Sequence, residues 1–299
     1  MLSSRQLQTV TNKQGDTIMK IGVSGASGKL GQAVLAELAA RGGHEVVAIS
    51  RTPDTAAGVE ARHGDYDDPK SLVSAYAGLD RVLLIPSSDL TPGARSRQNK
   101  NAVEAAVAAG LKHIVYLSAL GTKAATDPAM EASYWVGEQT LIAKAPAWTI
   151  LRMNYYAESF ADEVRMAAGP SAIFGLGESR VAFVSRNDIA AASAGALTNE
   201  GHNGAIYNLT GPKALTGQER AAIASQVTGQ TIGFQVVPEE GMRAGLAGAG
   251  LPSVVIDLII GIQSSFVKGN FDIVTGDIAK LSDKPARPLE VTLAAALSQ

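Results

Sequence analysis

Three evenly spaced glycines follow the first apolar segment of the chain. Residues 20–24 read Lys-Ile-Gly-Val-Ser, and a helical pattern begins four residues later. Glycines at such a junction allow a tight turn, bring backbone N–H groups close to a phosphate and let a helix pack tightly on a strand. The pattern therefore predicts a dinucleotide pyrophosphate site, with a simple tight turn as the alternative. The expected ligands are Gly25, Ser27, Gly28, Lys29, Leu30 and Gly31.

A cation rather than an acid follows the second apolar segment. Proteins that prefer NAD commonly place an acid there to bind the ribose 2′-hydroxyl, whereas this chain has Arg51. A forked guanidinium suits a 2′-phosphate. Arg51, with Lys29 as a second candidate, predicts a preference for NADPH, and a solvated surface arginine is the alternative.

Other cofactor contacts are expected where later strands end. Asp65 and Tyr66 belong to the segment His-Gly-Asp-Tyr-Asp-Asp-Pro and are expected beside the adenine, although an aspartate before a helix is also an ordinary cap. Contacts near the nicotinamide and its ribose are expected from Pro86, Ser87, Ser118, Met153 and Asn154.

These positions require a parallel sheet with crossover helices. Short β-branched runs alternate with longer alanine-rich stretches. The near-continuous apolar runs indicate a sheet that is covered on both faces. Strands are predicted near residues 20–24, 45–50, 59–62, 81–85, 113–118 and 148–151, and helices near 29–41, 69–77, 95–109 and 129–143. The fold class is α/β, a doubly wound Rossmann fold.

The alternation weakens after Arg152, which predicts a second unit. We expect residues 19–152 to form the NAD(P)-binding domain, with 181–212 returning to it. Residues 153–180 and 213–299 are expected to form a smaller, mainly helical substrate-binding lobe over the carboxyl ends of the strands. The apolar segment 254–262 is expected to be a buried helix, 289–297 a terminal helix on the lobe, and 1–18 a flexible tail.

Composition excludes several classes of function. The 299 residues include no cysteine, which removes thiolate nucleophiles and cysteine-based metal or iron–sulfur sites. With 26 basic and 28 acidic residues, nucleic acid is an unfavoured partner. No apolar run reaches the roughly 20 residues of a membrane span. The four scattered histidines match no metal-ligand spacing, so no metal is predicted, and a cytoplasmic location is expected.

Taken in order, the motifs resemble a known family. The glycine loop, Arg51, residues 63–69, the strand at 108–118 and the segment Leu-Arg-Met-Asn-Tyr-Tyr-Ala-Glu-Ser-Phe at 151–160 are similar to NmrA-like, atypical short-chain dehydrogenases/reductases. Within this group the chain looks like type 2 NAD(P)H quinone oxidoreductases and triphenylmethane reductases. The resemblance extends from Met19 to the C-terminus. It implies a monomeric or homodimeric reductase that passes hydride from NADPH to a conjugated small-molecule acceptor.

The resemblance also bears on catalysis. Ordinary members of the wider superfamily carry a Tyr-x-x-x-Lys pair, whereas this chain has Tyr134 and Glu138. A carboxylate does not lower a phenol pKa as a lysine does, which favours direct hydride transfer. Tyr134 and Tyr155 are the candidates for a proton donor or a stacking group. An aromatic wall for the acceptor is expected from Tyr155, Tyr156 and Phe160, with core packing as the competing interpretation.

Two other functions fit the same resemblance. One is a non-catalytic NADP-binding redox sensor that couples nucleotide binding to a protein partner. The other is an enzyme similar to isoflavone reductases, which reduces a C=C or ether bond. That enzyme normally uses a lysine where this chain has Glu138, so it is the weaker alternative.

Overall fold

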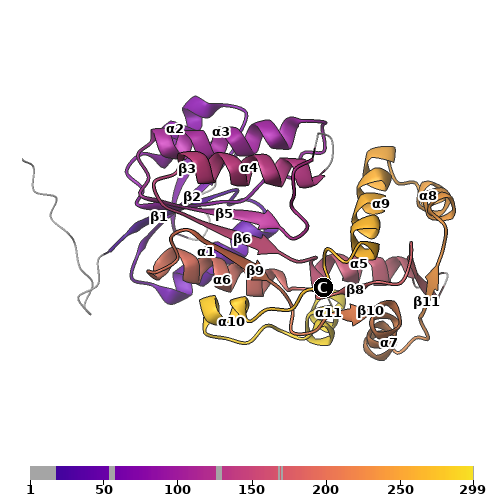
Figure 1. Cartoon of the computed structure of the whole chain (residues 1–299). Helices are drawn as coiled ribbons and strands as arrows, with labels where there is room; N and C mark the ends of the chain where they lie inside the picture. Colours follow the sequence, from indigo (N-terminus) through magenta and orange to yellow (C-terminus); the bar gives the residue numbers. More distant parts are fainter. Residues whose placement is uncertain (1–17, 54–57, 126–129, 168, 170, 299) are drawn as a thin grey trace, which may run out of the picture.

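A seven-stranded parallel sheet forms the centre of the larger domain (Figure 1). The computed structural model describes residues 18–53, 58–125, 130–167, 169 and 171–298, so the predicted tail lies outside the described residues except for Ile18. The strand order is β3-β2-β1-β4-β5-β6-β9. The strands are β1 (Lys20–Ser24), β2 (Glu45–Ser50), β3 (Glu60–His63), β4 (Arg81–Leu84), β5 (His113–Ala119), β6 (Trp148–Met153) and β9 (Ala205–Leu209).

Helices cover both faces of this sheet (Figure 1). On one face lie α2 (Pro69–Tyr76), α3 (Ala94–Ala108) and α4 (Met130–Lys144). On the other lie α1 (Lys29–Arg41) and α6 (Arg186–Thr198), which pack on each other and on the sheet. The predicted doubly wound fold is confirmed, and the strand and helix limits differ from the expected ones by at most two residues.

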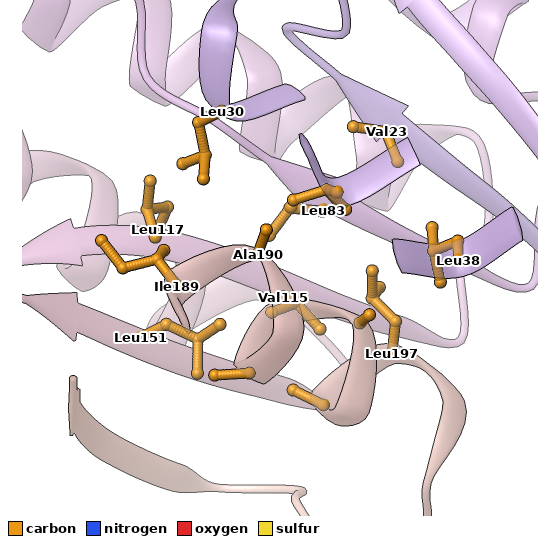
Figure 2. Packing of buried hydrophobic residues seen from close by; sticks show 14 of the residues in the cluster. Val23, Leu30, Leu38, Leu83, Val115, Leu117, Leu151, Ile189, Ala190 and Leu197 are labelled. Atoms are coloured by element: carbon orange, nitrogen blue, oxygen red, sulfur yellow. The ribbon is translucent and has the colours of Figure 1, made fainter. Parts of the chain in front are cut away.

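Side chains of the strands interdigitate with α1 and α6 in the core of this face (Figure 2). Leu83 and Val115 have no exposed surface, and Leu30, Leu38 and Ile189 pack against them from the two helices. Burial of a large aliphatic side chain stabilises the folded state by about 1.5–3 kcal/mol. The apolar residues that predict a sheet covered on both faces are therefore the ones against which its helices pack.

A second unit lies beyond the carboxyl ends of β5 and β6 (Figure 1). It contains two small two-stranded sheets, in which β8 pairs with β10 and β7 pairs with β11. Its elements are α5 (Ala157–Ala167), β7 (Ala172–Gly175), β8 (Arg180–Val181), β10 (Leu215–Thr216), α7 (Gly217–Thr228), β11 (Gly233–Val236), α8 (Glu239–Gly248), α9 (Ser253–Val267) and α11 (Leu289–Leu297). The lobe is mainly helical, as the sequence predicts.

Two elements differ from the sequence-based expectations. The short helix α10 (Asp277–Ser282) packs on α6 and β9 of the larger domain, although the expected division assigns 213–299 to the lobe. The Asp277 carboxylate accepts a hydrogen bond from the backbone N–H of Asn208, 2.7 Å away, which fixes this position. Helix α9 is half-buried rather than buried, because Ile260 faces the core while Val254 is 45% exposed.

A buried arginine organises the core of the lobe. Arg220 is 2% exposed, and its guanidinium lies 5.5–5.8 Å from the ring centres of Phe183, Phe234 and Phe266. Its Nη2 donates to Ser179 Oγ at 3.1 Å. Such cation–π contacts partly replace the hydration that the cation loses.

The same core holds a carboxyl group with an unusual pKa. Burial raises the pKa of Glu163 to about 7, against the opposing attraction of Arg220. Since this pKa lies above the unfolded value of about 4.3, ionisation of Glu163 opposes folding. Its contribution to stability is complete at low pH and is lost as the pH rises from about 4.5 through about 7.

Replacement of Glu163 by glutamine should remove this pH dependence. We expect Glu163→Gln to match the wild type in Tm near pH 4.5, where both side chains are neutral, and to exceed it at pH 8. Thermal unfolding across this range measures the difference. The matched control is Asp162→Asn, because the neighbouring Asp162 is largely exposed. An identical pH profile of Tm in the Glu163→Gln variant and the wild type would contradict the assignment.

Candidate functional site

The predicted glycine loop lies where the order of the sheet reverses. The chain runs outward from β1 to β3 on one side and from β4 to β9 on the other. The loop after β1 therefore lies at the switch point between β1 and β4, where such sheets commonly bind their ligands. The N–H groups of Gly25 and Ala26 both donate to Ile49 O at 3.0 Å. A Cβ on Gly25 would lie 3.1 Å from Ile85 Cβ. The loop is thus held between the ends of β2 and β4.

Two features of the loop require glycine. Gly25 has φ +91°, a conformation that other residues rarely adopt. A Cβ on Gly31 would lie 2.3 Å from the carbonyl oxygen of Gly25 and 2.7 Å from Ala26 Cα. Helix α1 can therefore approach the end of β1 only because residue 31 has no side chain.

The first turn of α1 presents open backbone donors. The first helical hydrogen bond runs from Gln32 N–H to Gly28 O, so the N–H groups of Lys29, Leu30 and Gly31 precede the ladder. Gly28 provides no side-chain cap, and no acidic residue occupies the first turn. Ser27, Gly28 and Lys29 are exposed, whereas the Leu30 side chain is in the core. This helix end can bind an anion through backbone N–H groups and the helix dipole.

The expected contacts of the nucleotide's far end lie on one side of this loop, after β2 and β3. Arg51 follows β2, and its side chain is exposed and has no ion pair with any residue that the structure describes. Asp65 is half-buried, and its Oδ1 accepts the N–H of Asp67 at 3.0 Å, while Asp68 caps α2. The cap anticipated as an alternative for Asp65 thus belongs to Asp68.

Tyr66 and Ser87 are tied to the segment that follows β4. Tyr66 donates through its hydroxyl to Ile85 O at 2.8 Å, and burial raises its pKa to about 12. Ser87 donates to the side-chain oxygen of Gln98 on α3. Pro86 lies between these two anchors and is half-buried. This segment is therefore held beside the glycine loop, where the sequence places a nicotinamide ribose.

A buried carboxylate ties α4 to two strands. Glu138 is 1% exposed, and its two oxygens accept from Arg152 Nε at 2.9 Å and Nη2 at 2.6 Å. Ser118 Oγ also donates to Glu138 Oε1 at 2.6 Å. The carboxylate that replaces the lysine of the superfamily pair is thus fully engaged with β5 and β6, and Tyr134 is one helical turn away from it.

Two expected nicotinamide contacts differ from the prediction. Ser118 has no exposed surface, and its hydroxyl serves Glu138. Asn154 is 2% exposed; its Nδ2 donates to Phe271 O at 3.1 Å and its Oδ1 accepts Tyr155 N–H at 2.7 Å. Both side chains are bonded to other protein groups and have almost no exposed surface to offer a cofactor. Met153 is half-buried and anchors the next loop, because its carbonyl oxygen accepts Leu120 N–H at 2.9 Å.

A cavity of about 560 Å³ opens at this edge of the sheet. Its walls come from the segment after β4, the loop after β5, the first half of α4, helix α9 and the chain that follows it. The parallel strands place their carboxyl ends at one edge, so this cavity lies on the same side as the glycine loop. Apolar and aromatic lining of this size suits a small flat molecule.

The aromatic wall of this cavity differs from the predicted one. Tyr134 and Phe271 line it, whereas Tyr155 and Tyr156 do not. Phe160 has no exposed surface and packs in the core of the lobe, so its prediction as a substrate-lining residue is wrong. The reason is the direction of α5, whose apolar face turns into the lobe rather than toward the sheet.

Tyr155 supports the wall from behind, whereas Tyr156 packs elsewhere. Tyr155 packs edge-to-face on Phe271 and Phe266, with ring centres 6.5 Å and 5.1 Å apart. Tyr156 packs toward the core of the larger domain, and the Arg186 guanidinium lies 5.5 Å from its ring centre. Tyr155 is therefore a packing residue of the lobe rather than a proton donor that faces the cavity.

Sequence reasoning missed several residues of the cavity. Arg95 on α3 lines it, and its guanidinium carbon lies 4.9 Å from the centre of the Tyr134 ring. The exposed side of α9 contributes Val254, Leu258 and Ile262. The sequence signal for this wall is the number of apolar residues in α9, which is larger than one buried helix face requires.

Comparison with known proteins supports these assignments. Residues 25–200 match a family described as NAD(P)H-binding. Quinone oxidoreductase 2 of Escherichia coli is 32% identical over 277 residues, which cover 90% of this chain and 96% of that protein. The chain belongs to the NAD(P)H-binding family. The resemblance to reductases of the NmrA-like group is thereby confirmed.

Two further relatives have other acceptors in their names. An NAD(P)H azoreductase of Xenophilus azovorans is 29% identical, with 78% of this chain and 80% of that protein covered. The crystal structure of Citrobacter sp. triphenylmethane reductase complexed with NADP(H) has 31% sequence identity and a TM-score of 0.83, and the match covers 93% of this chain and 100% of that one.

The residues of this chain fit an NAD(P)H cofactor. The loop offers open N–H groups at a helix N-terminus. Residue 31 must be glycine for this geometry, because a Cβ there would clash with the backbone of Gly25.

Among the described residues, no group of three or more acidic or histidine side chains could hold a metal. No helix in the described part of the chain has the length and apolar character needed to cross a membrane.

The glycine loop allows a prediction that separates folding from cofactor binding. Gly31→Ala should lower Tm by about 5 °C, because the new Cβ meets backbone atoms that cannot move independently. It should also weaken NADPH binding.

Gly28→Ala should leave Tm unchanged, since the nearest atom to its Cβ is 3.5 Å away. It should still weaken NADPH binding about tenfold by obstructing the pyrophosphate. Thermal unfolding and calorimetric titration measure the two effects, and unaltered NADPH affinity in Gly28→Ala would contradict a pyrophosphate site here.

Proposed function

We propose that this protein is an NADPH-dependent oxidoreductase that transfers hydride directly to a conjugated aromatic acceptor such as a quinone. The observation that carries the proposal is the cavity at the carboxyl edge of the sheet, walled by Tyr134 and Phe271 on the same side as the glycine loop. An aromatic wall of this kind stabilises a flat ring by stacking.

The arrangement of Glu138 favours an acceptor that needs little acid assistance. Glu138 is held by Arg152 and Ser118 and has no exposed oxygen to give or take a proton. The lysine that lowers the pKa of a catalytic tyrosine in the wider superfamily is absent. A quinone or azo acceptor delocalises the incoming electrons, so proton transfer is less demanding than for an alcohol or a simple ketone. The names of the relatives, which include quinone, azo and triphenylmethane acceptors, support the same conclusion.

The chain's own residues bind and orient in this proposal. NADPH, when bound, supplies the hydride. The N–H groups at the start of α1 hold the pyrophosphate, and Arg51 pairs with the 2′-phosphate. Tyr134, Phe271 and the apolar side of α9 hold the acceptor and exclude water, so positioning provides most of the rate acceleration.

Stopped-flow oxidation of bound NADPH tests the proposal. With a panel of quinones, azo dyes, enones and simple ketones, we expect saturable oxidation of NADPH by quinones and azo dyes, and little by simple ketones. NADPH binding without turnover on any acceptor would overturn the proposal and favour the redox-sensor alternative. Preferential reduction of an isolated C=C bond would favour an enzyme similar to isoflavone reductases.

The preference for NADPH is tested by Arg51. Arg51→Ala should raise the KM for NADPH about tenfold through loss of a charge-assisted contact, with little change for NADH. Lys284→Ala is the control, because it removes an exposed cation in the loop after α10. Equal efficiency with both cofactors in the wild type and in Arg51→Ala would contradict the assignment.

The monomeric or dimeric state and the cytoplasmic location stay predictions from sequence.

A further inference from the structure

Among the residues that the structure describes, four charged side chains line the acceptor cavity, and they are not equivalent. The acids are Asp89 and Asp257, and the bases are Arg95 and Lys268. A ligand in a cavity binds mainly to polar groups that have no partner within the protein. The protein contacts of these four side chains therefore determine whether the cavity favours an anionic or a cationic ligand.

Both acids are already engaged by protein donors. Asp257 accepts from Arg243 Nη1 at 2.7 Å, and this arginine does not line the cavity. Asp89 accepts from the N–H of Thr91 at 2.9 Å and from Gln98 Nε2 at 3.2 Å. Asp257 is thus paired with a cation outside the cavity, whereas Asp89 is hydrogen-bonded to the neutral Thr91 and Gln98.

The bases are not engaged in this way. Within the described part of the chain, neither Arg95 nor Lys268 forms an ion pair. Arg95 Nε is buried and has no hydrogen-bond partner there. Without a carboxylate partner among the described residues, the Arg95 guanidinium attracts an anionic group that enters the cavity.

Tyr134 holds the Arg95 guanidinium in a defined place. The guanidinium carbon lies 4.9 Å from the centre of the ring, and both residues line the cavity. Because a stacked guanidinium loses little side-chain freedom when it binds, it is preorganised for a planar anionic group. Arg95 also lies in the first turn of the 15-residue helix α3, where the helix dipole adds positive potential.

We infer that the preferred acceptor is an aromatic molecule with an anionic substituent, a carboxylate, sulfonate or phosphate, that binds Arg95 and Lys268. This inference rests on the proposed function and names the substrate class of the same site. Cationic triphenylmethane dyes are then poor acceptors for this chain, because Arg95 and Lys268 repel them and Asp89 is the one acid in the described lining without a cationic partner.

Matched acceptors test the inference. The pair is 1,4-naphthoquinone-2-sulfonate and 2-methyl-1,4-naphthoquinone, which share the ring system and differ in charge, and a cationic triphenylmethane dye is the third acceptor. Arg95→Gln and Lys268→Gln remove one cation each, and Arg95→Lys keeps the charge but not the planar fork. The control is Lys100→Gln, which removes an exposed cation from α3 outside the cavity.

We expect Arg95→Gln to lower kcat/KM for the sulfonate about tenfold, mainly through KM, and to change the neutral quinone less than about twofold. Lys268→Gln should act in the same direction, Arg95→Lys should retain part of the preference, and Lys100→Gln should have no effect. Reduction of the cationic dye should improve in Arg95→Gln. Equal losses with the sulfonate and the neutral quinone would overturn the inference.

A binding measurement separates this inference from the proposed function. Anthraquinone-2-sulfonate is titrated calorimetrically into the complex of the full chain with NADP⁺, where no turnover occurs. We expect binding in the wild type and about tenfold weaker binding in Arg95→Gln and Lys268→Gln. Turnover of neutral quinones without binding of the sulfonate would refute the anionic preference alone. Binding of the sulfonate without oxidation of NADPH by any acceptor would refute the reductase function alone.

Discussion

The close approach of α1 to the end of β1 is the constraint on which the site depends. Gly31 lets the helix rest on the backbone of Gly25 and Ala26, and the same loop bonds to Ile49 of β2 and touches Ile85 after β4. Three strand ends are therefore fixed relative to one helix N-terminus. Because these are backbone contacts, they hold the open N–H groups in place without any particular side chain, which is what a site for a phosphate requires.

The ion pair of Glu138 and Arg152 fixes the other side of the site. It connects α4 with β6, and Ser118 adds β5 to the same carboxylate. A buried carboxylate is costly unless its oxygens are satisfied, and here three donors satisfy them. The pair places Tyr134 one turn further along α4, in the cavity wall. One arrangement thus removes an acid from the chemistry and orients the aromatic residue that the acceptor meets.

The sequence predicts the geometry of the glycine loop well and the lining of the cavity poorly, for a physical reason. The loop from Gly25 to Gly31 and the strand before it are local, so spacing and residue type define their geometry. Phe160 was misassigned because adjacency to a sheet strand does not tell which way α5 turns its apolar face. The exposed side of α9 was missed for a similar reason, since an apolar run does not distinguish a core contact from a cavity wall.

The two halves also differ in how they can change. In the proposed function, backbone groups of the glycine loop bind the cofactor, whereas the acceptor meets side chains as distant in sequence as Arg95, Tyr134 and Leu258. Substitution of a side chain on α3 or α9 alters the cavity without moving the glycine loop, because the loop is fixed by its own backbone contacts. Relatives with one cofactor fold and several acceptor names are the expected outcome of this division. If the inference holds, the charge of the lining side chains, rather than the fold, decides among acceptors of similar shape.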